Sequence, residues 1–175
     1  YLFISIFNEL FLTAGPIIAG LPLPLSALQI LFINLILDSS PALSLSFEDG
    51  RNYLAEKVKR KVFFFDPETK LYTFGLGFFT SALLLITYIV LAKVFLPVNL
   101  AATFIFFLLG SYSLFSILAL RELDISIFKY NPFSNKYLNA SIVVGLIFLL
   151  AAIYIRPVAQ IFAAEPKSYR DMPTR

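Results

Sequence analysis

Long apolar stretches alternate with shorter polar ones along this chain, in a pattern typical of a membrane protein. The apolar segments cover approximately residues 2–19, 26–47, 72–96, 100–120 and 137–155. Each has close to the roughly 20 residues that an α-helix needs to cross the hydrocarbon core of a bilayer. The pattern therefore predicts an all-α integral membrane protein with five transmembrane helices.

The connections between these segments predict an antiparallel bundle and its orientation. The stretch 20–24, Gly-Leu-Pro-Leu-Pro, is a tight turn between the first two segments, and Pro97 separates the third from the fourth. The two longer links, residues 48–71 and 121–136, carry most of the basic side chains. Because basic loops tend to stay on the cytoplasmic side, both links are expected in the cytoplasm and both tight turns outside. The cell membrane is the expected location.

Composition agrees with this class and narrows the chemistry. The chain is 59% hydrophobic and only 14% charged, against about 25% charged residues in typical soluble proteins. It contains no Cys and no His, which excludes disulfides and metal sites built from thiolate or imidazole. The net charge of +3 is modest. The lipid bilayer is therefore an expected partner and nucleic acid is not.

Few charged side chains lie inside the apolar segments. Three polar side chains there, Glu9, Asn34 and Asp38, are expected to lie close together. Asn34 and Asp38 are four residues apart, so they lie on one face of a helix. Counting about 1.5 Å per residue from the turn at 20–24 brings Glu9 and Asp38 to nearly the same depth. A carboxylate at membrane depth costs at least roughly 2.5–3.5 kcal/mol, so it normally faces a cavity, a partner or an ion. These oxygens suit a hard cation, or one carboxylate carries a proton.

Pro41 is expected to break the second helix near Asp38–Pro41. Proline has no N–H, so Pro41 cannot donate to the backbone carbonyl of Leu37, one turn earlier. That carbonyl is a further candidate ligand, because interrupted helices recur in membrane ion sites.

Residues 29–48 resemble the sixth transmembrane helix of P-type cation-transporting ATPases. They match nearly all of the family pattern Gln-x-Leu-x-x-Asn-Leu-x-x-Asp-x-x-Pro-Ala. Residues 1–24 are similar to the fifth helix and its outer turn, and 114–138 to the end of the eighth and the start of the ninth. The resemblance covers residues 1–163 as one C-terminal transmembrane domain, and 164–175 are expected to form a disordered polar tail.

The resemblance is strongest to the calcium-pump branch, and it implies three cation ligands, Glu9, Asn34 and Asp38. Ser113 lies approximately where those pumps carry an acidic or amide residue, and is a weaker candidate. Ile6 and Leu37 stand where those pumps carry Asn and Thr, so one divalent ion per cycle is expected. Calcium is the implied cargo, while manganese, magnesium and a proton use the same oxygen ligands and stay open.

Members of this family draw energy from ATP through domains that have no counterpart motif here. The phosphorylation motif Asp-Lys-Thr-Gly-Thr does not occur in the sequence. The chain is therefore expected to be the transport module of a pump, a fragment not catalytic alone. ATP and magnesium would act through the missing N-terminal and catalytic portion. The alternative is a non-enzymatic small membrane protein, or a decayed fragment, that acts only in assembly with other chains.

Overall fold

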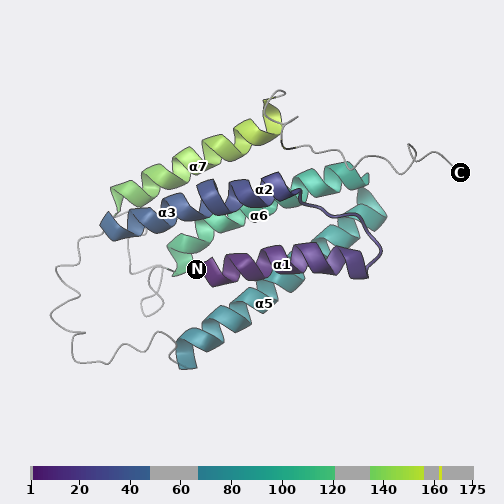
Figure 1. The fold of residues 1–175 in the computed structure, drawn as a ribbon, viewed down its shortest axis with the longest axis horizontal. Coiled ribbons are helices and arrows are strands. Elements are labelled where there is room, and N and C mark those ends of the chain that lie inside the picture. Colours follow the sequence, from purple (N-terminus) through teal and green to yellow (C-terminus); the bar gives the residue numbers. More distant parts are fainter. Residues whose placement is uncertain (1, 48–66, 121–134, 156–161, 163–175) are drawn as a thin grey trace, which may run out of the picture.

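The computed structural model describes residues 2–47, 67–120, 135–155 and 162, and all regular structure in these residues is helical (Figure 1). The elements in chain order are α1 (Leu2–Ile18), α2 (Ala27–Phe32), η1 (Ile33–Asp38), α3 (Ser39–Ser44), η2 (Leu45–Phe47), α5 (Pro67–Val90), η4 (Leu91–Phe95), α6 (Val98–Leu120) and α7 (Lys136–Tyr154). The predicted all-α membrane fold is confirmed for the described part of the chain.

Four described helical stretches are long and apolar enough to cross a membrane. They are Ala27–Ser44, Phe74–Phe95, Val98–Ala119 and Lys136–Tyr154. The remaining predicted span, α1, is an apolar helix of 17 residues, which is the lower end of the range for a spanning helix. The two polar links lie mostly outside the described residues and the tail 164–175 lies wholly outside, so their predicted positions stay predictions.

Two helix packings build the bundle. α1 packs along α5, whereas the helix made of α2, η1 and α3 packs against α6 and α7 (Figure 1). Gly20 ends α1 with a φ of 67°, a left-handed conformation that glycine adopts without steric cost. The amide of Leu21 then bonds to the carbonyl of Pro16 at 2.8 Å, which reverses the chain toward α2.

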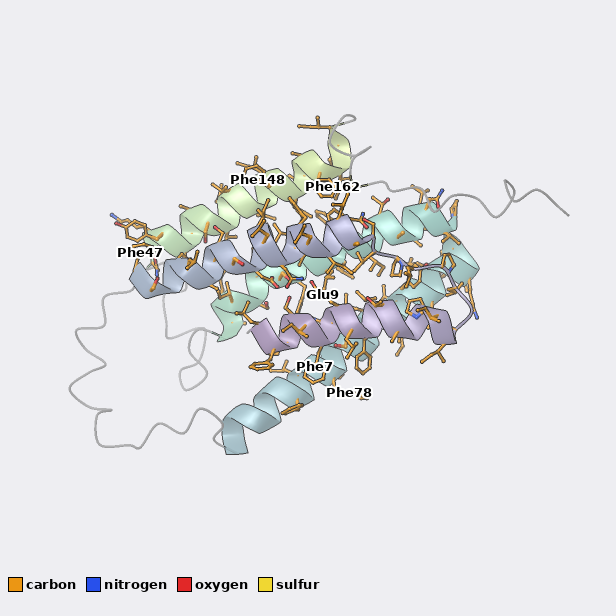
Figure 2. All side chains as sticks on the ribbon, in the orientation of Figure 1. Phe7, Glu9, Phe47, Phe78, Phe148 and Phe162 are labelled. Carbon is orange, nitrogen blue, oxygen red and sulfur yellow. The ribbon has the colours of Figure 1, made fainter. Side chains whose placement is uncertain are left out.

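The second packing group has a dense apolar core. Leu37, Leu109 and Leu149, from η1, α6 and α7, are all fully buried. Gly110 allows this closeness, because a Cβ there would come within 2.8 Å of Leu149 and 2.9 Å of Leu37. Large apolar side chains such as Phe148 point outward instead (Figure 2), as expected for helices surrounded by lipid.

The distortion predicted near Asp38–Pro41 takes the form of a π-helical turn, and the helix continues through Pro41. In η1 the N–H of Ser39 bonds to the carbonyl of Asn34, five residues back. An α-helical Pro41 would press its ring against the carbonyl of Leu37. The π-helical turn ends at Asp38, three residues before the proline, and the chain continues as the α-helix Ser39–Ser44. The backbone hydrogen bonds of this helix therefore join residues five apart, instead of four apart, in the turn that contains Asn34 and Asp38.

Candidate cation site

Glu9 and Asn34 are in direct contact between α1 and η1. The side-chain nitrogen of Asn34 lies 2.7 Å from one carboxylate oxygen of Glu9 and 2.9 Å from the other. It also lies 3.1 Å from the carbonyl of Ile30, one turn back in its own helix. Figure 2 shows Glu9 between α1 and the helix that contains η1. The structure thus brings these two predicted site residues together.

Asp38 has a different partner on α1. The hydroxyl of Ser5 donates a hydrogen bond to Oδ2 of Asp38, and the hydroxyl of Ser113 on α6 lies 3.4 Å from that of Ser5. All three residues are almost fully buried, with exposed fractions of 2%, 1% and 1% for Ser5, Asp38 and Ser113. Ser113, predicted as a weaker candidate, therefore lies beside Asp38's partner.

These contacts form two consecutive rungs between antiparallel helices. Ser5 and Glu9 are four residues apart on α1, and Asn34 and Asp38 are four apart on the facing segment. Glu9 pairs with Asn34 while Ser5 pairs with Asp38. Glu9 and Asp38, which the sequence predicts at nearly one depth, thus lie on successive rungs, and the two α1 residues of these rungs are about one helical turn, or ~6 Å, apart.

The chemistry available here is that of two carboxylates with neutral oxygens around them. Within the described ranges no group of three or more His, Cys, Asp or Glu side chains could hold a metal ion. The basic residues whose side chains the structure describes, Lys93 and Lys136, are both exposed. Hydroxyls and amides are therefore the groups seen to solvate the two carboxylates.

The side chains of Leu37 and Ile6 lie away from these polar contacts. Leu37 is fully buried in the apolar core, so only its backbone carbonyl remains a candidate ligand. Ile6 is 54% exposed and faces outward from α1, whereas its neighbour Ser5 takes the inward position. Sequence reasoning missed Ser5. Its spacing of four residues before Glu9, matching that of Asn34 and Asp38, is the pattern that marks it.

A second buried polar contact joins α1 to α5. Asn8 is fully buried, and its side-chain oxygen accepts hydrogen bonds from Ser81 at 2.8 Å and Thr80 at 3.1 Å. Its side-chain nitrogen is buried without a partner. Asn8 thus lies about 100° around α1 from Glu9 and fastens this helix to α5.

Comparison of the sequence with known proteins identifies its family. The family model described as Cation transporting ATPase, C-terminus, matches residues 22–174. A calcium-transporting ATPase of Bacillus subtilis (strain 168) is 28% identical over 166 residues, which cover 93% of this chain and 18% of that protein. Calcium-transporting ATPase 1 of Bacillus cereus (strain ATCC 10987 / NRS 248) is 31% identical over 183 residues, covering 94% of this chain and 20% of its own length.

A relative from yeast shows a similar identity and coverage. Calcium-transporting ATPase 1 of Saccharomyces cerevisiae (strain ATCC 204508 / S288c) is 30% identical over 161 residues, covering 87% of this chain and 16% of that protein. No solved structure shows a significant match. The chain thus spans no more than about a fifth of the length of these curated relatives. With its helical membrane segments, it belongs to the cation-transporting ATPase family, as the family's C-terminal membrane region.

Proposed function

We propose that this chain carries the ion-binding step of an ATP-driven pump that moves one calcium ion per cycle across the cell membrane. The observation that carries the proposal is the contact between Glu9 and Asn34, beside the buried carboxylate of Asp38. Two carboxylates and several neutral oxygens match the ligands that calcium prefers. Hydrolysis of ATP with magnesium would take place in a part of the protein that this sequence does not contain.

Asn34 has to change its role for the ion to bind. Its amide nitrogen now donates to Glu9, and an N–H group cannot ligate a cation. Rotation about the terminal side-chain bond exchanges the nitrogen for the carbonyl oxygen, which is a calcium ligand. The same amide thus stabilises the carboxylate of Glu9 by hydrogen bonding before the ion binds, and contributes a ligand oxygen afterwards.

The remaining ligands would come from the surroundings of these residues. The backbone carbonyl of Leu37 and the hydroxyl of Ser113 are the weaker members of the proposed set. The π-helical turn ends at Asp38, next to Leu37, and such turns are frequent at functional sites. Neutral ligands of this kind bring the coordination closer to the six to eight oxygens typical of calcium.

The test is a titration of ATP hydrolysis by the intact protein in lipid vesicles with calcium, manganese and magnesium. Calcium should stimulate turnover at the lowest concentration, and both Asp38→Asn and Glu9→Gln should lose that stimulation. Thr103→Ala on α6 is the matched control, because its exposed hydroxyl bonds only within its own helix. Stimulation of Asp38→Asn equal to that of the wild type would remove Asp38 from the site.

Ion counting and the wild-type response test the rest of the proposal. Equilibrium binding should give one calcium ion per protein, and two tightly bound ions would contradict the single-ion cycle. A wild-type protein that hydrolyses no ATP in the presence of any of these cations would favour the alternative of a non-enzymatic membrane component.

A further inference from the structure

A hydroxyl on α1 reaches the carboxylate that the proposed function needs most. Ser5 is 2% exposed and donates to Oδ2 of Asp38, which is 1% exposed. The described hydroxyls of several other helical residues bond instead to a carbonyl of the preceding turn, as Thr13 does to Glu9 at 2.8 Å. A bond of this kind stays within one helix and does not constrain where that helix lies relative to its neighbours. The bond from Ser5 therefore ties Asp38 to a different helix.

Burial makes this bond matter for the orientation of Asp38. A buried carboxylate is stabilised by donors that stay in place, and hydrogen bonds to charged groups are stronger than neutral ones. The basic side chains that the structure describes are exposed and do not reach the bundle interior. Ser113 extends the contact, since its hydroxyl lies 3.4 Å from that of Ser5 and either can donate. When the hydroxyl of Ser113 donates to the oxygen of Ser5, the hydroxyl of Ser5 is left to donate to Asp38. Consecutive hydrogen bonds of this kind strengthen one another.

We infer that Ser5 is a positioning residue, which holds the Asp38 carboxylate in the orientation that receives the cation. This inference rests on the proposed function and adds a residue to it that neither the family pattern quoted above nor the paired carboxylates contain. Ser5 acts through Asp38, so its loss should weaken ion binding without slowing the steps that follow once the site is filled.

The experiment compares cation-stimulated ATP hydrolysis of Ser5 variants in the intact protein, reconstituted in vesicles and titrated with calcium. Ser5→Ala should raise the calcium concentration for half-maximal rate about tenfold, as expected for a lost bond to a charged group. The maximal rate at saturating calcium should stay within about twofold of the wild type, because only binding is weakened. A residue that merely supports folding would lower the maximal rate or the yield instead.

Two further variants keep the inference testable if Ser5→Ala is poorly folded. Ser5→Thr retains the hydroxyl and should restore a half-maximal concentration near that of the wild type. Ser5→Cys retains the volume with a weaker donor, and should give a value between those of wild type and Ser5→Ala. Ser44→Ala is the matched control, since Ser44 is also buried, but its hydroxyl bonds to the carbonyl of Pro41 and to Ser141 of α7 rather than to a predicted site residue.

The outcomes separate the inference from the proposed function. If Asp38→Asn loses calcium stimulation while Ser5→Ala and Ser5→Cys titrate like the wild type, Ser5 has no positioning role and the proposed function stands. If Asp38→Asn keeps full stimulation, the proposed function and the inference both fail. A fall in the maximal rate of Ser5→Ala at unchanged half-maximal calcium would also overturn the inference.

Discussion

Asn34 holds the carboxylate of Glu9 from the facing helix, with its amide nitrogen 2.7 and 2.9 Å from the two carboxylate oxygens. The amide of Asn34 is neutral, so it stabilises the carboxylate by hydrogen bonding and leaves its charge available to a cation. A basic side chain in this position would neutralise that charge. The pair therefore suits a group that must be stable both before and after a cation binds. Four measurements test this and the packing that supports it.

Asn34→Asp should make the stability of the protein depend on the cation. The change replaces a donor by a second carboxylate facing Glu9, and two like charges repel each other. The loss is expected to be about 1.5–3 kcal/mol, the usual worth of a hydrogen bond to a charged group. Thermal unfolding in detergent should show a lowered Tm without calcium that calcium restores. Asn99→Asp, at an exposed position of α6, is the control, and equal Tm values for both variants would contradict the role of Asn34.

Asn8→Ala should loosen the contact between α1 and α5. It removes the acceptor of the bonds from Ser81 and Thr80, and interhelical hydrogen bonds in membrane proteins contribute about 0.6 kcal/mol on average and up to about 1.7 kcal/mol. Unfolding by denaturant in mixed micelles should show a loss in this range. A double-mutant cycle with Ser81→Ala isolates the pair, and strictly additive losses would show that the contact does not couple the helices.

Gly110→Ala should destabilise the packing of α6 against η1 and α7. A Cβ at Gly110 would approach Leu149 and Leu37 to within 2.8 and 2.9 Å, and both leucines are fully buried. Overpacking of this kind costs about 1–3 kcal/mol. Gly75→Ala is the control, because a Cβ there meets nothing within 4 Å, and it should be neutral or slightly stabilising. A Gly110→Ala protein as stable as Gly75→Ala would show that the core yields without cost.

Ser26→Ala should weaken the start of the helix that carries Asn34 and Asp38. Ser26 accepts from the backbone N–H of Gln29 at 3.2 Å, and the side chain of Gln29 accepts from the N–H of Ser26 at 2.8 Å. Loss of such a cap costs about 1 kcal/mol, readable as a lowered Tm. Ser26→Thr keeps the hydroxyl and should retain most of the stability. Indistinguishable Tm values for the two variants would mean that the cap does not limit stability.

Much of the fold follows from local features of the sequence. The apolar segments are long enough to be recognised singly, because each spans a bilayer almost by itself. The Gly20–Pro24 turn forces the first two helices to be antiparallel, and the spacing of Asn34 and Asp38 puts both on one helix face. Pro41 marks the place of a distortion, but the sequence could not distinguish an unwound break from the π-helical turn that η1 contains.

The partners of each polar residue were decided by packing between helices. The pairing of Glu9 with Asn34, and of Asp38 with Ser5, depends on how far α1 slides along η1, which the contacts of α1 with α5 help to set. Asn8 shows the same limit, because only the structure shows that it is completely buried and bonded to Ser81 and Thr80 of α5.

The sequence by itself determined that this is a helical membrane protein with two carboxylates and an amide within its apolar segments, because hydrophobic length and helical spacing are local properties. Only the tertiary structure decided that these groups form two rungs one turn apart and that Ser5 and Ser113 join the second of them. The register between two helices depends on side chains far apart in the chain, and no local pattern contains it.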